Sequence, residues 1–176
     1  DAYTLDGTPA DCVRASFLGM MDEKPDIVMS GINDGANCGY DTLYSATVAA
    51  GVEGLLYDVP VFCFSKEFGE DSGAQDEYLD EIMKYLFKQE KVKGQLMNIN
   101  FPACSKEECK GILYDRTLAK KAYFDDRYIR QPKEDGQYNI CLKTDKITDA
   151  EAGSDMDAVL RKYISVGKVK NYVLWS

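Results

Sequence analysis

The sequence predicts an α/β protein in which helices flank a mostly parallel sheet and a long β-hairpin extends from the C-terminal part. Short apolar runs rich in β-branched and aromatic residues lack polar alternation, which is typical of strands buried on both faces of a parallel sheet. Stretches with helical spacing separate these runs, as in βαβ units. After residue 103 the strand-like runs become short and lie between long polar stretches, a pattern that favours an extended hairpin over a second core.

The first predicted element is a helix that begins at Thr8. Thr8 is a good N-cap, and Pro9 suits the first helical position because its missing N–H is not needed there. Helical spacing predicts one buried face, formed by Val13, Phe17, Leu18 and Met21. Residues 25–26 are expected to end this helix.

Three strands and two more helices complete the predicted core. The strand-like runs are residues 27–29, 59–64 and 96–101. One apolar stripe predicts a helix over residues 45–56, and a second helix is indicated by Leu79, Ile82, Met83 and Leu86. The acidic run 67–81 indicates solvated surface around the start of that second helix.

We expect residues 1–103 to form the α/β core and residues 104–176 to form a hairpin or oligomerisation extension of the same domain. Within the extension, the apolar runs at 111–114, 138–142 and 163–166 predict short strands, and residues 155–162 predict a short helix.

Composition narrows the possible functions. The net charge of −9 over 176 residues disfavours nucleic acid and anionic membranes as partners, because both are polyanions that bind basic surfaces. No apolar run approaches the ~20 residues of a membrane-spanning helix, and the first residues lack the basic-then-apolar pattern of a signal peptide. We therefore expect a soluble, cytoplasmic protein.

Cysteine and histidine usage restricts the chemistry further. The six cysteines form no CxxC pair, and Cys12 and Cys63 lie in apolar stretches, so reduced structural thiols are expected. The chain contains no histidine. A Ser-His-Asp triad or a histidine-ligated zinc therefore cannot be assembled from this chain alone.

A Gly/Asn-rich loop is the candidate functional site. Residues 30–39 (SGINDGANCG) follow a predicted parallel strand, and ligands of open α/β sheets bind at that edge. Glycines such as Gly35 let the backbone approach a ligand, while Asn33 and Asn37 offer amide oxygens for a divalent cation and N–H donors for a phosphoryl group. Ser45 and Thr47 then open the next helix, whose free N–H groups can bind an anion.

A plainer interpretation of these residues is also open. Asparagine and glycine dominate ordinary turns, so the loop can be a simple connector and Ser45 only a helix cap. The loop is neither a P-loop, since it lacks GK[ST], nor a GxGxxG fingerprint, since its glycines are four apart.

Several motifs together resemble the SurE family. Residues 25–33 (PDIVMSGIN), 35–39 (GANCG) and 43–50 (LYSATVAA) are similar to its central signature. Residues 6–12 (DGTPADC) resemble its GTPxDC helix start, and residues 153–166 resemble its GTDxxAVxxGYVSITPL ending. The resemblance runs in order along nearly the whole chain and implies a Rossmann-like SurE fold.

The resemblance implies a metal-dependent phosphatase that hydrolyses nucleoside 5′- and 3′-monophosphates, often with exopolyphosphatase activity, using Mg²⁺ or Mn²⁺. It places Asn33 among the metal ligands. It assigns substrate binding to Gly35, Asn37, Ser45 and Thr47, and catalytic roles to Asn37 and Ser45. The metal would polarise the phosphoryl oxygen and activate water, while Asn37 and the helix terminus would stabilise the developing charge.

The sequence also departs from the family pattern. It contains neither the Asn-Asp-Asp-Gly motif after the family's first strand nor the following Ser-Gly-rich loop, so we expect an N-terminally incomplete chain that lacks the other metal ligands. Ala46 stands where the family has glycine, and a histidine near the family's C-terminus is missing. A catalytically inactive phosphate- or nucleotide-binding module is therefore the alternative function.

Residues 120–130 allow two interpretations. One is a platform for single-stranded nucleic acid, with the aromatic residues Tyr123 and Phe124 beside the cations Lys120, Lys121, Arg127 and Arg130, but neighbouring acids and the net charge oppose this. The other interpretation is a hairpin arm used in self-association. In the family such an arm is exchanged between subunits, which implies a homodimer or homotetramer.

Overall fold

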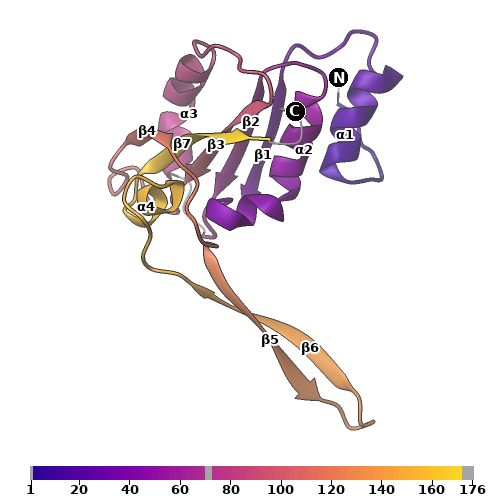
Figure 1. Ribbon diagram of the computed structural model, residues 1–176, viewed down its shortest axis with the longest axis vertical. Helices are drawn as coiled ribbons and strands as arrows, with labels where there is room; N and C mark the ends of the chain where they lie inside the picture. Colours follow the sequence, from indigo (N-terminus) through magenta and orange to yellow (C-terminus); the bar gives the residue numbers. More distant parts are fainter. Residues whose placement is uncertain (1, 70–72, 172–176) are drawn as a thin grey trace.

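In the computed structural model of the chain, which describes residues 2–69 and 73–171, helices flank a five-stranded sheet and a two-stranded hairpin projects from it (Figure 1). The sheet order is β1-β2-β3-β7-β4. The parallel strands are β1 (Val28–Asp34), β2 (Val61–Lys66) and β3 (Gln95–Phe101). β7 (Ile164–Lys170) runs antiparallel to β3, and β4 (Ile112–Arg116) pairs in parallel with β7. The predicted α/β class is therefore confirmed.

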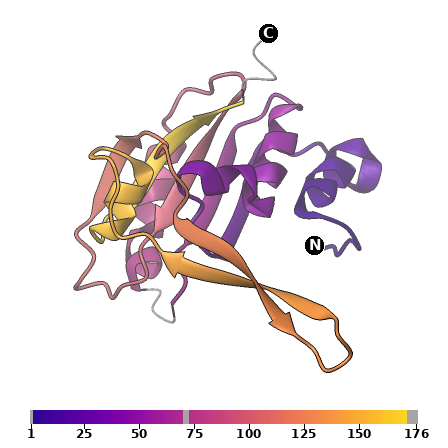
Figure 2. The same cartoon turned by 60° about the horizontal axis from the view of Figure 1, so that its bottom comes forward.

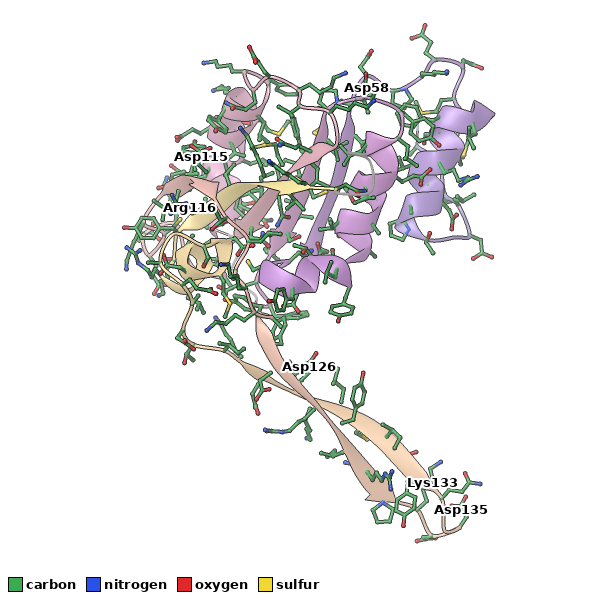
Figure 3. All side chains as sticks on the ribbon, viewed as in Figure 1. Asp58, Asp115, Arg116, Asp126, Lys133 and Asp135 are labelled. Atoms are coloured by element: carbon green, nitrogen blue, oxygen red, sulfur yellow. The ribbon has the colours of Figure 1, made fainter. Side chains whose placement is uncertain are left out.

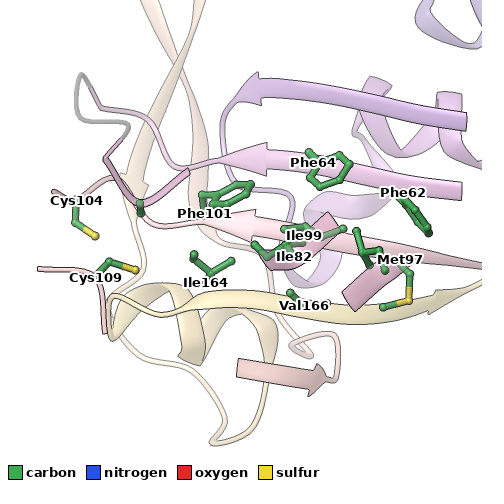
Figure 4. Packing of buried hydrophobic residues seen from close by; sticks show 12 residues of the cluster. Phe62, Phe64, Ile82, Met97, Ile99, Phe101, Cys104, Cys109, Ile164 and Val166 are labelled. Carbon is green, nitrogen blue, oxygen red and sulfur yellow. The ribbon is translucent and has the colours of Figure 1, made fainter. Parts of the chain in front are cut away.

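Helices cover both faces of the sheet because successive side chains along each strand point to opposite faces, and both faces are apolar. Val61 and Cys63 of β2 pack in a cluster with residues of α2 (Ala46–Leu55). Phe62 and Phe64 point the other way and pack beneath α3 (Gly73–Leu86), where the cluster in Figure 4 also contains Ile99 of β3. Burial of such side chains is the main stabilisation of the fold. No helix among the described residues is long and apolar enough to cross a membrane.

The first helix begins as predicted but ends early. Thr8 forms a capping box with Asp11 and starts α1 (Pro9–Ala15), which continues into a wide turn, η1 (Ser16–Met20). Leu18 and Met21 are exposed, so only Phe17 of the predicted face is fully buried. The reason is the backbone: Leu18 and Gly19 leave helical geometry, and this rotates the later side chains away from the core.

Two further burial predictions were wrong. Cys12 is exposed, because α1 buries none of its residues, whereas Cys63 is buried as expected. Met29 is exposed although a strand buried on both faces was predicted, because β1 is an end strand in the order of the described sheet.

The arm, residues 124–146, is a long antiparallel hairpin. β5 (Phe124–Pro132) and β6 (Tyr138–Lys146) pair in register from Phe124 with Lys146 to Pro132 with Tyr138. Both ribbon views show the arm extending away from the sheet and helices (Figure 2). Asp126 lies near its root, and Lys133 and Asp135 lie at its far tip (Figure 3).

The second half of the chain contributes more to the core than expected. β4 and β7 lie after residue 103, yet both belong to the five-stranded sheet. β7 is held there because Ile164 and Val166 are fully buried in the same cluster as Ile99. A short helix, α4 (Asp155–Leu160), precedes β7, and only the arm projects outward.

Candidate functional site

The candidate site lies where the parallel strands β1, β2 and β3 end. After β1, residues 35–38 form an irregular segment that leads into the short 3-10 helix η2 (Gly39–Leu43) and then to α2. Gly35 is fixed at the start of this segment, where its N–H donates to the carbonyl of Lys66 at 2.7 Å and its φ is +130°. A positive φ of this size is easy only for glycine.

Asn33, the expected metal ligand, is at the centre of a polar cluster. Its Oδ1 accepts hydrogen bonds from Thr47 Oγ1 at 2.8 Å, Ser65 Oγ at 2.9 Å and Asn37 Nδ2 at 3.2 Å. Its Nδ2 donates to the carbonyl of Gly35 at 2.9 Å. We call Asn33, Asn37, Thr47 and Ser65 the Asn33 cluster; its mutual hydrogen bonds hold each side chain in one orientation.

Asn37 is buried although it lies outside helices and strands. Its Nδ2 donates to Ser65 Oγ at 2.6 Å as well as to Asn33. Its backbone N–H donates to Asn100 Oδ1 at 2.7 Å, and its carbonyl accepts from Nδ2 of Asn98 at 2.8 Å and of Asn100 at 3.3 Å. Both the side chain and the main chain of Asn37 are therefore hydrogen-bonded to residues of the sheet.

Ser45 caps α2 and stands beside the Asn33 cluster rather than within it. Its Oγ accepts from the N–H of Val48 at 3.1 Å, as predicted for an N-cap. The first turn of α2 still has N–H groups without intrahelical partners, and the helix dipole adds positive potential there. The expected site residues thus divide into the Asn33 cluster with Gly35 and the helix start at Ser45.

The loop after Asn37 is tied to the root of the arm through a buried carboxylate. Asp155 Oδ2 accepts from the N–H of Gly39 at 2.9 Å, and its Oδ1 accepts from the N–H of Ala119 at 2.9 Å. Burial raises the pKa of Asp155, and the backbone hydrogen bonds oppose that rise. Asp41 adds a second link by accepting from the N–H of Tyr123 at 2.7 Å, and burial likewise raises its pKa.

Glu67, just after β2, anchors the base of the arm. Its carboxylate accepts a hydrogen bond from the hydroxyl of Tyr123, the residue just before β5, and forms an ion pair with Lys146, the last residue of β6. The same carboxylate accepts from the N–H of Ala103 at 3.0 Å. Burial is the main cause that raises the pKa of Tyr123, and the hydrogen bond to Glu67 raises it further. Tyr123 is only 1% exposed, so it cannot stack on a base, and the nucleic-acid platform loses its central aromatic residue.

The described residues alone do not fit Mg²⁺ or Mn²⁺. Such ions take several oxygen ligands that include carboxylates. Asn33 Oδ1 already accepts three hydrogen bonds, and the neighbouring carboxylate of Asp34 pairs with Lys66 at 2.5 Å. Over residues 2–69 and 73–171, no group of three or more His, Cys, Asp or Glu residues could hold a metal ion.

Four residues of the site were not predicted from the sequence: Ser65, Asn98, Asn100 and Asp155. Asn98 and Asn100 are two apart in a strand, so they share a face, and both are buried. Paired amides on one face of an otherwise apolar strand are a signal that could have identified them, since buried polar groups need partners. Ser65 and Asp155 carry no comparable local signal.

Comparison with known proteins gives matches to one family. The family described as Survival protein SurE matches residues 1–123. Two relatives, each named 5'-nucleotidase SurE, come from Clostridium botulinum (strain ATCC 19397 / Type A) and Chloroflexus aggregans (strain MD-66 / DSM 9485). Each is 35% identical to this chain, and the matches cover 94% and 96% of this chain and 67% and 68% of the relatives.

A solved structure gives the same result. The crystal structure of the SurE protein from Aquifex aeolicus superposes with a TM-score of 0.74 at 33% identity, covering 94% of this chain and 67% of that one. The resemblance inferred from the motifs is thereby confirmed, and the chain belongs to the SurE family.

Proposed function

We propose that this chain carries the phosphate-binding part of a 5'-nucleotidase that hydrolyses nucleoside 5′(3′)-monophosphates to nucleoside and phosphate. The observation that carries the proposal is the Asn33 cluster lying beside the capped start of α2, at the carboxyl edge of the parallel strands. That edge is where open α/β sheets bind ligands. The names of the two relatives given above supply the substrate class.

The residues of the chain can receive a phosphoryl group in two ways. N–H groups in the first turn of α2 attract its oxygens, and the Ser45 hydroxyl, whose Oγ already accepts from Val48, can donate its own hydrogen outward. An oxygen near Asn37 would take over a hydrogen that Nδ2 now gives to Asn33 or Ser65. Donors held in place before the reaction stabilise charge on the phosphoryl oxygens without reorganisation.

Dependence on a divalent cation, Mg²⁺ or Mn²⁺, is part of the proposal. Such an ion supplies charge neutralisation for phosphoryl transfer when it is bound. From the described residues Asn33 Oδ1 is the oxygen offered, and it would have to give up hydrogen bonds from the cluster to serve as a ligand. The carboxylates that such an ion also needs would have to come from outside these residues. Hydrolysis rates with each ion and with a chelator measure this dependence directly.

Release of phosphate from 5′-AMP, compared between the wild-type chain and Asn37→Ala, tests the function. We expect metal-dependent turnover that falls about 100-fold or more in the variant, the scale found for loss of one preorganised donor. Asn139→Ala, which changes an exposed asparagine on the arm, is the matched control. If wild type binds 5′-AMP in calorimetry but never hydrolyses it, the chain is the alternative, an inactive nucleotide-binding module.

We also propose that the arm pairs with a second copy of this chain. Alternation along the hairpin puts an apolar set on one face, and its members are exposed: Tyr128, Tyr138, Ile140 and Leu142. A two-stranded hairpin is marginally stable alone in water, so this face gains from being covered. A second arm offers the same apolar face, and isologous pairing makes a homodimer, from which a homotetramer can be built.

Sedimentation of wild type, Ile140→Lys and Asn139→Lys tests self-association. Residues 140 and 139 are adjacent but point to opposite faces of the hairpin. We expect a dimer or tetramer for wild type and Asn139→Lys, and a monomer for Ile140→Lys. A monomeric wild type at all concentrations, or equal effects of the two lysines, would refute the proposal.

A further inference from the structure

We propose that Asn100 and Asn98 are positioning residues of the site: they clamp the main chain of Asn37 so that its side-chain amide is delivered to Asn33 and Ser65. The proposal rests on the proposed function for its catalytic consequence, but the clamp itself is a property of the chain. Among the described residues, both asparagine side chains hydrogen-bond to the main chain of Asn37, and they reach the rest of the cluster only through Asn37.

The clamp answers a need created by burial. Asn37 is 7% exposed and lies in an irregular segment, so no helix or strand ladder satisfies its N–H and C=O. A buried backbone group without a partner costs as much as a lost hydrogen bond. Asn100 satisfies both groups, with Oδ1 accepting from the N–H and Nδ2 donating to the carbonyl, as the edge of a strand would.

Asparagine is the residue type that this task requires. A primary amide carries an acceptor and donors on one planar group, whereas a hydroxyl is shorter and a carboxylate has no donor. Asn98 adds the shorter bond to the same carbonyl, 2.8 Å against 3.3 Å. Because both residues belong to β3, the buried central strand between β2 and β7, the clamp ties the main chain of Asn37 to the middle of the sheet.

The position of Asn37 in turn fixes the cluster. Its Nδ2 bridges Asn33 Oδ1 and Ser65 Oγ, which lie at the ends of two neighbouring strands. A shift of the Asn37 backbone would withdraw this bridge. Displacements of about 1 Å in such groups cost up to about 100-fold in rate.

Ser165→Ala is a matched control within the same layer. Ser165 lies directly opposite Asn100 in the β3–β7 ladder and is equally buried, and its Oγ has no hydrogen-bond partner among the described residues. Replacing it removes a buried polar atom without touching Asn37. Asn98→Ala is an intermediate variant, since Asn100 still holds both backbone groups.

Amide hydrogen exchange followed by NMR tests the clamp without any need for activity. We expect slow exchange for the Asn37 amide in wild type and in Ser165→Ala, and about 100-fold faster exchange in Asn100→Ala, while the Ile99 amide in the β3 ladder stays protected. Rapid exchange of Asn37 in wild type, or loss of protection at Ile99 as well, would overturn the clamp. If Asn100→Ala does not fold, the exchange rate of the Asn37 amide in wild type still tests the clamp.

Kinetics with 5′-AMP then separates positioning from mere support of the fold. We expect kcat to fall about 100-fold in Asn100→Ala and less in Asn98→Ala, with KM changing by no more than about threefold, at a temperature where every variant is folded. Unchanged kcat with only a lower Tm would reduce the asparagines to a structural role. If wild type shows no turnover, the proposed function fails, and the exchange data still decide the clamp.

Discussion

The N–H of Gly39 donates a hydrogen bond to Oδ2 of Asp155 across 2.9 Å, joining positions 116 residues apart in the sequence. Through this contact the loop that follows Asn37 is bound to the start of α4. The other oxygen of Asp155 holds Ala119 in the segment that leads to the arm. The site loop and the root of the arm are therefore packed as one unit, and changes at this junction should affect both.

Gly39→Ala should damage this junction severely. Gly39 has φ +54°, and a Cβ placed there would lie 2.1 Å from the carbonyl oxygen of Lys121, a backbone atom that cannot move aside alone. We expect a loss of more than about 2 kcal/mol in the free energy of unfolding, measured by urea denaturation. Gly136→Ala is the control: its φ is +81° but no atom lies within 4 Å, so only the backbone cost of about 1 kcal/mol applies.

Asp155→Asn should change how stability depends on pH. Burial raises the pKa of Asp155 in the folded state above its usual 3.8, so folding favours the protonated form. Its contribution to the free energy of unfolding is present below pH 3.8 and is lost as pH rises through the folded-state pKa.

The variant has no such titration, so its curve provides the comparison. We expect the difference in free energy of unfolding, wild type minus Asp155→Asn, to shrink as pH increases from about 3 to about 6. Asn also turns an N–H donor toward the N–H of Gly39 or of Ala119, which adds a penalty that does not vary with pH. A difference that grows with pH would contradict the burial effect.

Local signals in the sequence predicted the elements well. The cap at Thr8, the cap at Ser45 and the apolar run of β3 depend on neighbouring residues, and the structure contains all three. The face of the first helix was wrong because the turn at Gly19 interrupts the helical period. Helical spacing predicts a common face only while the helix continues.

The site was predictable only in part, because its contacts join distant strands. Asn33, Asn37 and Thr47 fall within one short stretch, and the structure brings them together. Ser65 and Asn100 reach the same cluster from β2 and β3, and their roles depend on strand register. Register is set by tertiary packing and is not written in any local motif.

Tyr123→Phe should destabilise the protein by removing one donor from a buried carboxylate. The hydroxyl of Tyr123 donates to Glu67, and Phe keeps the ring in the core while deleting that bond. We expect the free energy of unfolding to fall by about 1–3 kcal/mol, measured by urea denaturation. Tyr128→Phe, which changes an exposed hydroxyl on the arm, should stay within about 0.5 kcal/mol of wild type. If both variants lowered the free energy of unfolding equally, the hydrogen bond between Tyr123 and Glu67 would not anchor the arm.

The hydroxyl of Thr47 should matter more than its methyl group. Thr47 Oγ1 donates to Asn33 Oδ1 at 2.8 Å and helps to hold the cluster beside the start of α2. Thr47→Val has nearly the same shape without the hydroxyl, whereas Thr47→Ser keeps the hydroxyl and loses the methyl group. With 5′-AMP as substrate, we expect kcat/KM to fall about 10-fold to 100-fold in Thr47→Val and to stay within about threefold of wild type in Thr47→Ser. If the valine variant is as active as the serine variant, the hydrogen bond to Asn33 does not contribute to hydrolysis.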